Sequence, residues 1–142
     1  MGVSSGTPLI FIMIVLNKIK CNHCGDEIIS HSVHDFVWCK CEKVAVDGGC
    51  EYQHLTGNPD DYTNMVIYDD APYEIVRENF HRGGRGKSGR EDLKWVPMSK
   101  MSDEWLKACI VYNKDREMGD RENKLYQKEI DYRQENNISI KE

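Results

Sequence analysis

The chain has 142 residues, of which 39% are hydrophobic and 30% are charged, and its formal net charge at pH 7 is −5. This composition excludes disorder over the whole chain and fits one globular domain with a smaller module stabilised by metal or sulfur. An acidic chain does not attract nucleic acid at long range, so the composition also argues against generic DNA binding.

The first recognisable element is an apolar run at residues 8–16. A membrane-spanning helix needs about 20 apolar residues, so this run is too short to cross a bilayer. No positive residue precedes it and no small-residue cleavage site follows it, which argues against a signal peptide. We therefore expect a buried strand that continues to Lys20, no membrane association, and residues 1–12 as a possible extension.

Residues 13–70 are expected to form an antiparallel β module. Apolar and polar residues alternate at 34–39 and 43–46, a pattern that is typical of paired strands. A tight turn is predicted at 47–49, where Asp is followed by two Gly, and a further strand is predicted at 65–68.

Four cysteines of this module come in two close pairs and predict a structural zinc site. Cys21 and Cys24 form a C-x-x-C motif followed by Gly, and Cys39 and Cys41 form a C-x-C pair further along the chain. Two such pairs on adjacent hairpin tips can place four thiolates tetrahedrally around Zn²⁺. Four thiolates leave no open position for water, so we expect structural rather than catalytic zinc.

Other interpretations of these cysteines stay open. They could be reduced core thiols, or disulfides if the protein were exported. A thioredoxin-like redox pair should open a helix after a strand, whereas a turn and another strand are expected after Gly25. Cys50 could replace Cys41 as a ligand, and Cys109 is expected in a helical core. The other spare ligand candidates are His23, His31 and His34.

The cluster of His31, His34 and Asp35 is a weak candidate for acid–base chemistry. Such a cluster at a hairpin tip is more often solvated or adjacent to a metal site. The sequence also lacks the His-x-Glu and Pro-Cys-x-x-Cys motifs of zinc deaminases, so no catalytic residues are predicted and the protein is not expected to be an enzyme.

Residues 71–100 are expected to contain a short helix up to Phe80, an exposed mobile loop at 81–92 and a strand at 93–97. The loop ends in Gly-Lys-Ser, but a phosphate-binding P-loop needs a Gly where His81 stands and a leading hydrophobic strand. We instead expect a cationic loop that binds phosphates or an acidic protein surface, or a solvated loop without a partner. The candidate binding residues are Arg82, Arg85, Lys87 and Arg90.

Residues 101–135 predict a helical hairpin. Ser102 can cap a first helix whose apolar residues recur at helical spacing, and Gly119 separates it from a second helix at about 121–134. Helices joined by a short turn pack antiparallel. The expected fold class is therefore α+β, with a zinc-ribbon-like antiparallel β module followed by a C-terminal helical hairpin.

Several segments resemble an uncharacterised family of small zinc-ribbon-like bacteriophage proteins, over about residues 15–133. The resemblance implies an accessory protein in the cytoplasm of a bacterial host cell, where zinc is favoured over disulfides. The position of Cys50 is commonly His in that family, which puts an essential role for Cys50 in doubt. The segments that carry the resemblance are 20–26, 34–41, 45–49, 82–87, 93–97 and 101–106.

Three hypotheses for function follow. The first is a non-enzymatic phage accessory protein that binds a host protein or nucleoprotein complex, such as an anti-CRISPR or anti-restriction inhibitor. The second is direct nucleic-acid binding through the basic loop at 82–90. The third is a nucleotide-ligand binder or enzyme that joins His31 or His34 to Arg82 or Arg85 in one deep pocket. A monomer or a homodimer fits any of them.

Overall fold

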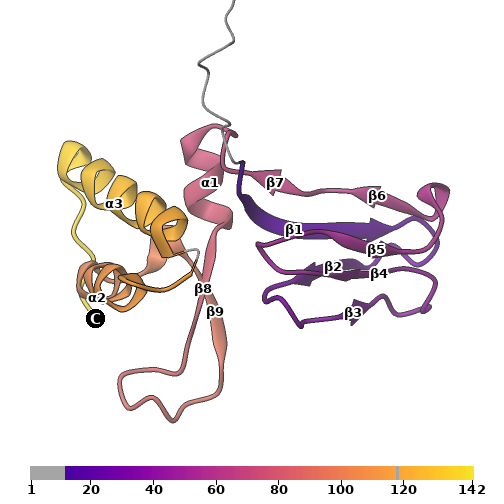
Figure 1. Ribbon diagram of the computed structural model, residues 1–142, viewed down its shortest axis with the longest axis horizontal. Coiled ribbons are helices and arrows are strands. Elements are labelled where there is room, and N and C mark those ends of the chain that lie inside the picture. The colour runs from indigo at the N-terminus through magenta and orange to yellow at the C-terminus, as the bar shows by residue number, and fades with distance from the viewer. Residues whose placement is uncertain (1–11, 118) are drawn as a thin grey trace, which may run out of the picture. The chain divides into compact units, whose positions relative to one another are not determined.

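The computed structural model describes residues 12–117 and 119–142 (Figure 1). These residues form antiparallel β-sheets and three α-helices, which confirms the predicted α+β class. The chain divides into two units, Met1–Ala71 and Pro72–Glu142. Residues 1–11, which hold most of the predicted extension and the start of the predicted apolar strand, lie outside the described residues.

The first unit is made of short antiparallel strands. A 3₁₀ turn, η1 (Pro59–Asp61), precedes β6. The predicted strands at 34–39 and 43–46 are present but shorter than expected. The strands are β1 (Ile14–Cys21), β2 (Glu27–Ser30), β3 (Val37–Trp38), β4 (Ala45–Asp47), β5 (His54–Thr56), β6 (Tyr62–Asn64) and β7 (Ile67–Tyr68).

Strand β1 is the central strand of the first sheet, where it pairs with β2, β6 and β7. Its first half, from Ile14 to Asn17, is buried on both faces, which explains the continuous apolar run in the sequence. In its second half Ile19 and Cys21 point into the core, whereas Lys20 is exposed. Alternation at the end of β1 therefore decides which face Cys21 occupies.

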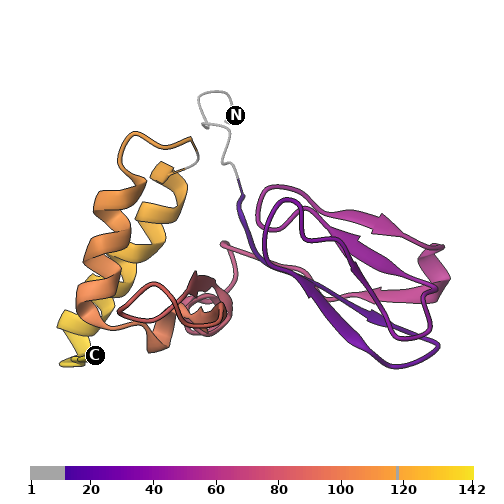
Figure 2. The same cartoon turned by 90° about the horizontal axis from the view of Figure 1, so that it is seen from below.

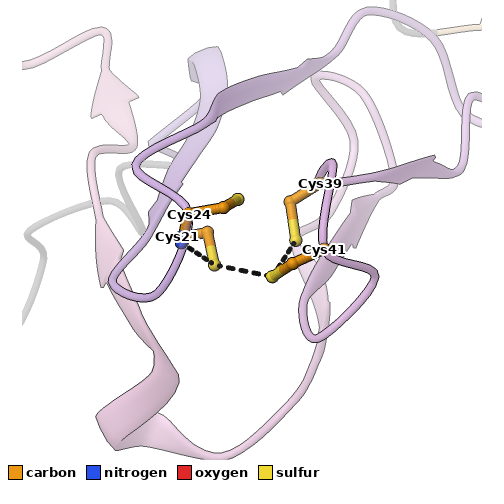
Figure 3. Close-up of side chains that lie close together, drawn as sticks. All are labelled: Cys21, Cys24, Cys39 and Cys41. Atoms are coloured by element: carbon orange, nitrogen blue, oxygen red, sulfur yellow. Dashed lines mark hydrogen bonds between the residues drawn. The ribbon is translucent and has the colours of Figure 1, made fainter.

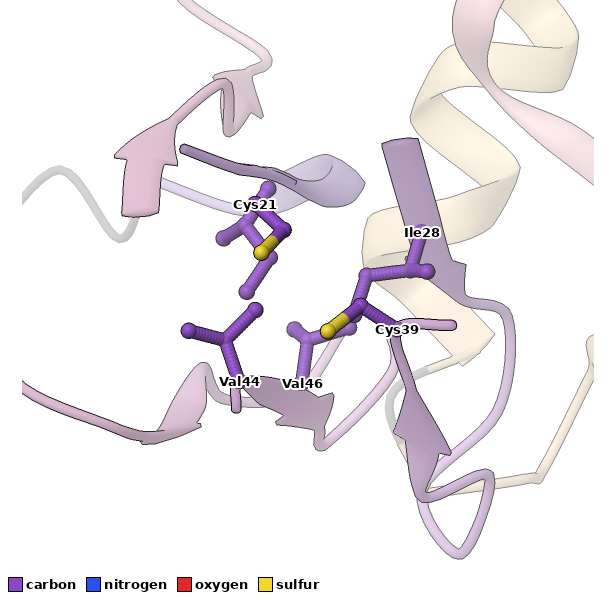
Figure 4. Packing of buried hydrophobic residues seen from close by; sticks show 6 residues of the cluster. Cys21, Ile28, Cys39, Val44 and Val46 are labelled. Carbon is purple, nitrogen blue, oxygen red and sulfur yellow. The ribbon is translucent and has the colours of Figure 1, made fainter. Parts of the chain in front are cut away.

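A second sheet has the order β3-β4-β5, and side chains from both sheets share one core. Val46 lies in the central strand of this sheet, where it pairs with Val37 on one side and Leu55 on the other. Figure 4 shows the buried cluster in which the two sheets meet. Its buried members are Ile19, Cys21, Ile28, Cys39, Val44 and Val46.

Buried Asn17 fixes the loop that joins β4 to β5. Its side-chain Nδ2 donates to the carbonyl oxygens of Asp47, Gly49 and Tyr52 at 3.0–3.1 Å. Gly48 and Gly49 both have positive φ, and a side chain at either position would overlap neighbouring backbone. The predicted turn at 47–49 therefore depends on glycine geometry and on a polar side chain from β1.

The second unit mixes three α-helices with a two-stranded hairpin. Strands β8 and β9 pair antiparallel, with Gly83 opposite Trp95. The prediction of a loop over 81–92 was wrong for its first four residues, because these form β8. The elements are α1 (Tyr73–Asn79), β8 (His81–Gly84), β9 (Lys94–Pro97), η2 (Met98–Lys100), α2 (Asp103–Asn113) and α3 (Gly119–Asn136).

Helices α2 and α3 lie side by side in the second unit (Figure 2). Helix α2 begins as predicted, since the Ser102 side chain accepts a hydrogen bond from the amide of Trp105. Asn123 of α3 links the two helices, because it donates to the carbonyl of Ile110 and accepts from Asn113. Within the described residues, no helix combines the length and apolar character needed to cross a membrane.

A buried ionic network connects the elements of the second unit. Glu129 of α3 is fully buried and accepts hydrogen bonds from Tyr73, Arg77 and Arg133 at 2.7–2.9 Å. Arg133 also donates to Asp103 of α2 and to the carbonyl of Met98. Each of these charges has a hydrogen-bonded partner of opposite charge, which compensates its loss of hydration.

Candidate metal centre

The structure places all four predicted ligands at the tips of two hairpins (Figure 3). Cys21 ends β1 and Cys24 lies in the turn before β2, whereas Cys39 and Cys41 lie in the turn between β3 and β4. The two turns belong to different sheets. A metal ion held by the four sulfurs would therefore tie the two sheets of the first unit together.

Main-chain hydrogen bonds shape both turns. In the first, Cys21 donates to the carbonyl of Asp26 at 2.9 Å, and the chain reverses through Gly25 with φ of +76°. In the second, Cys39 donates to the carbonyl of Val44 at 3.1 Å. Each turn thus carries two sulfurs on a hydrogen-bonded backbone.

The first turn also aims amide groups at a sulfur. The amides of His23 and Cys24 lie 3.4 and 3.5 Å from Sγ of Cys21. These donors direct the positive ends of their dipoles towards Cys21, an arrangement that suits a thiolate ligand.

Distances between the sulfurs fit tetrahedral coordination. The four Sγ atoms lie within 4.8 Å of one another, and Cys41 lies 3.6 Å from both Cys21 and Cys39. Four thiolates at about 2.3 Å from one Zn²⁺ would lie about 3.8 Å apart, which the present arrangement reaches with small side-chain rotations. These four cysteines form no disulfide, since 3.6 Å is well beyond a disulfide length of about 2.05 Å.

The pKa values of the Cys24 and Cys41 thiols are shifted in opposite directions. Main-chain groups of Asp26 and Cys41 lower the pKa of the exposed Cys24 thiol to about 6. At Cys41 the main chain of Lys43 acts in the same direction, but burial and the three neighbouring sulfurs raise the pKa to about 12. Negative charge is thus favoured at one sulfur and opposed at another, and a divalent cation would relieve that repulsion.

Burial divides the four ligands into two inner and two outer sulfurs. Cys21 and Cys39 are 0% and 2% exposed and belong to the hydrophobic core, whereas Cys24 and Cys41 are exposed. The amide of Lys40 donates to the Asp26 carboxylate at 3.1 Å, so the two turns are also linked directly. An ion bound here would lie between the core and the surface.

The spare ligand candidates lie outside the sulfur cluster. His23 contacts Asp61 at 2.7 Å, and Sγ of Cys50 lies 3.8 Å from the carbonyl of Val15. Cys109 is buried in the second unit. Among the described residues, the only group of at least three possible ligands that converges is the predicted set of four cysteines.

The histidine pair and the basic residues fall in different units. His31 and His34 belong to the first unit, and the Nδ1 atom of His31 lies 3.9 Å from Asp35. The arginines that the third hypothesis would join to them belong to the second unit.

The predicted phosphate-binding residues do not form one group. Arg82 is in β8 rather than in the loop, and its guanidinium donates to Tyr126 and lies 3.9 Å from Glu122. Arg85, Lys87 and Arg90 are exposed in the loop between β8 and β9. Expecting Arg82 to be an exposed loop cation was therefore wrong, because the strand turns its side chain towards α3.

Sequence reasoning missed a cavity in the second unit. It has a volume of about 510 Å³ and is lined by Arg85 and Lys87 from the loop, Lys94 and Val96 from β9, and Trp105 from α2. Helical spacing of the apolar residues in α2 predicts a core position for Trp105. No local pattern places it beside a loop that precedes it in the chain.

Sequence reasoning also missed an exposed aromatic pair on the first unit. Phe36 and Trp38 are 44% and 46% exposed, and their ring centroids lie 5.4 Å apart in an edge-to-face arrangement. Trp38 belongs to β3, an edge strand of the second sheet. The alternation that predicted this strand gave no sign that both rings face solvent.

One comparison with known proteins finds a match over the segment that holds the cysteine cluster. A family model described as a domain of unknown function (DUF7695) matches residues 13–57, a segment that includes all four cysteines of the cluster. No curated protein and no solved structure matches the chain. The description of this family names no function, so the predicted phage origin and host target stay predictions.

Proposed function

We propose that the first unit is a zinc-ribbon-like module whose Zn²⁺ is bound by Cys21, Cys24, Cys39 and Cys41. The observation that carries the proposal is the convergence of four thiol sulfurs, from two hairpins, within 4.8 Å. Tetrahedral sulfur sites take zinc or iron, and a site closed by four thiolates holds its ion for structure rather than for catalysis. In the second unit, α2 and α3 form a helical hairpin.

We further propose that the protein acts by binding a partner protein rather than as an enzyme. The exposed rings of Phe36 and Trp38 support this proposal, since aromatic side chains are enriched at protein interfaces and dominate their binding energy. In keeping with the resemblance to phage proteins, the partner is a bacterial host protein or nucleoprotein complex. Inhibition of an antiviral defence is the activity that such binding would serve.

Metal content tests the first proposal. Elemental analysis of the purified chain should give one zinc per chain, and Cys21→Ser should abolish metal binding. Cys50→Ala is the matched control, because Cys50 lies in the same unit but outside the cluster, and it should keep the metal. Iron in place of zinc would change the identity of the ion, and a metal-free, fully folded chain would refute the site.

Partner capture tests the second proposal. Immobilised protein should retain a specific partner from bacterial lysate, and Trp38→Ser should lose it without losing zinc. Tyr68→Ser is the control, because Tyr68 is also exposed but lies on β7 of the other sheet. Equal capture by the Trp38 and Tyr68 variants would show that the aromatic pair is not the interface.

A further inference from the structure

The cavity of the second unit has the size and walls of a small-molecule site. Its volume of about 510 Å³ falls within the range of roughly 300–1,000 Å³ that ligand pockets occupy. Its apolar surface comes from Trp105 and Val96, and charged side chains surround that surface. A ligand would therefore need both a flat apolar part and charged or polar groups.

Packing holds the indole of Trp105 in place at the cavity. A Cβ atom at Gly84 would lie 2.9 Å from two ring atoms of Trp105, so the ring packs directly against the backbone of β8. Glycine at this position is what allows the ring to approach. A ring positioned in this way can stack against a planar ligand without first losing side-chain freedom.

Two cations that line the cavity, Arg85 and Lys94, are available to an anion. Neither makes an ion pair with another described residue, although Arg85 has a weak hydrogen bond of 3.4 Å to the carbonyl of Glu91. The loop that carries Arg85 is ordered by main-chain hydrogen bonds, including one from Glu91 to the carbonyl of Arg85 at 3.0 Å. Arg85 is therefore held on a defined turn.

Lys87 is the third cation of the cavity, and it already has an anionic partner. Its Nζ lies 3.5 Å from the carboxylate of Glu142, which also accepts from the Ser102 hydroxyl. The Glu142 carboxylate thus lies where a ligand anion could approach Lys87. This contact partly neutralises Lys87.

Carboxylates that also line the cavity limit which anions it can bind. Glu91 and Asp92 line the cavity together with Glu142, so cations and anions are equal in number among the lining residues. A nucleic-acid strand or a strongly acidic peptide would bring several negative charges close to these groups, at a cost in repulsion. A ligand with one phosphate and several hydroxyl groups avoids that cost, because carboxylates accept hydrogen bonds from hydroxyls.

We propose that this cavity binds a nucleoside monophosphate. The base stacks on Trp105, the phosphate contacts Arg85 and Lys94, and the ribose hydroxyls donate to Glu91 or Asp92. No bond is made or broken, so the site is a binding site without catalysis. It lies entirely within the second unit and does not depend on the proposed metal centre or on the aromatic pair of the first unit.

Titration of the full-length, metal-loaded protein with AMP, followed by tryptophan fluorescence and calorimetry, tests the proposal. We expect saturable quenching by AMP, and much weaker binding of adenosine and of inorganic phosphate, because each supplies only half of the contacts. Arg85→Ala should weaken AMP binding by about tenfold, as expected for loss of a charge-assisted hydrogen bond. Arg90→Ala is the matched control, since Arg90 lies in the same exposed loop but does not line the cavity.

A variant that binds AMP more tightly than the wild type would show that the effects on binding do not come from a folding defect. Glu142→Gln should tighten AMP binding severalfold, because it removes a negative charge and releases Lys87. Absence of AMP binding at millimolar concentration would overturn the proposal, as would equal losses in the Arg85 and Arg90 variants. Tighter binding of a single-stranded oligonucleotide than of AMP, with a steep salt dependence, would instead assign the cavity to a nucleic-acid strand.

Discussion

At the scale of single residues, the two outer cysteines give the most direct test of metal binding in the folded protein. Both thiols are exposed, but only Cys24 has a lowered pKa, about 6, so without a ligand Cys24 should react readily with iodoacetamide, whereas the raised pKa of Cys41 slows its reaction. Coordination to the metal ion occupies the sulfur lone pairs, so the bound thiolates react poorly with iodoacetamide. We therefore expect Cys24 to resist alkylation in the metal-loaded protein and to react within minutes once a chelator is added, with Cys41 reacting more slowly, as followed by peptide mass spectrometry.

Buried Cys109 is the control for this labelling, because it lies in the second unit outside the cluster. It should stay unlabelled with and without the chelator. Equal reactivity of Cys24 before and after chelation would show that no metal protects it.

Asn17 is a residue whose structural role can be isolated. Its amide donates to three carbonyls of the 47–52 loop, and all three would lose this donor in Asn17→Ala. Leaving buried carbonyls without partners costs roughly 2–3 kcal/mol of unfolding free energy. Chemical denaturation should show this loss, whereas Asp70→Ala, at an exposed site of the same unit, should change stability by less than about 0.5 kcal/mol. Equal effects of the two substitutions would contradict this role.

At the scale of elements, the network around Glu129 joins α1, α2 and α3. Glu129→Gln leaves Arg77 without its counter-charge and Arg133 with only that of Asp103, and breaking such a network costs about 3–5 kcal/mol. Burial acts to raise the pKa of Glu129, but hydrogen bonds from Arg77, Tyr73 and Arg133 outweigh it and hold the pKa below its usual value. The carboxylate is therefore the form that stabilises the folded unit.

The sign of this pKa shift sets a pH dependence. Because the folded-state pKa is lowered, the stabilisation is complete above the unfolded value of about 4.3 and is lost as pH falls through the folded-state pKa. Denaturation at a series of pH values should show a large difference between wild type and Glu129→Gln at pH 7 that shrinks in acid. A difference that stays constant with pH would mean that the charge of Glu129 is not what stabilises the unit.

Local patterns predicted some elements and missed others for physical reasons. The start of α2 was predictable because Ser102 and the acidic residues after it form a local capping signal. Strand β8 was not predictable, because Gly83 and Gly84 have low strand propensity and no side chains that alternate. They form a strand since β9 pairs with them and the rings of Trp95 and Trp105 pack against their backbone, contacts that no local window contains.

The same distinction holds for the two candidate sites. The cysteine cluster could be predicted because each pair lies within one turn, so its spacing reflects its geometry. The cavity of the second unit could not, since Trp105 comes from a helix that follows the hairpin and packs on Gly84, a contact between residues far apart in the sequence. The prediction for Arg82 was wrong because it used charge alone. Arg82 lies in a strand rather than in a loop, and the strand directs its side chain towards α3.

At the scale of the whole molecule, the two units differ in charge and in what stabilises them. Residues 1–71 hold four Lys/Arg against ten Asp/Glu, whereas residues 72–142 hold fifteen against fourteen. The proposed zinc joins the two sheets of the first unit, and the Glu129 network joins the helices of the second. The stability of the first unit should therefore depend on metal, and that of the second should not.

Chelation of the full-length protein should accordingly unfold one unit and leave the other folded. Structural zinc sites supply much of the folding free energy of small modules, so removal of the ion should release the core around Val46. Helical circular dichroism from α1, α2 and α3 should persist. Before chelation, thermal unfolding should show a transition of the first unit that depends on the metal. After chelation, only the unfolding of the helical second unit should remain as a cooperative transition.

Tryptophan fluorescence can assign this loss to its unit, because Trp38 lies in the first unit and Trp95 and Trp105 lie in the second. Chelation should shift the emission of the wild type, and Trp38→Phe should remove most of that shift while keeping the helical signal. Zinc added back in excess should restore the original spectrum of the wild type. If chelation also abolished the helical signal, the two units would not be independent in stability, and the metal would support the fold of the whole chain.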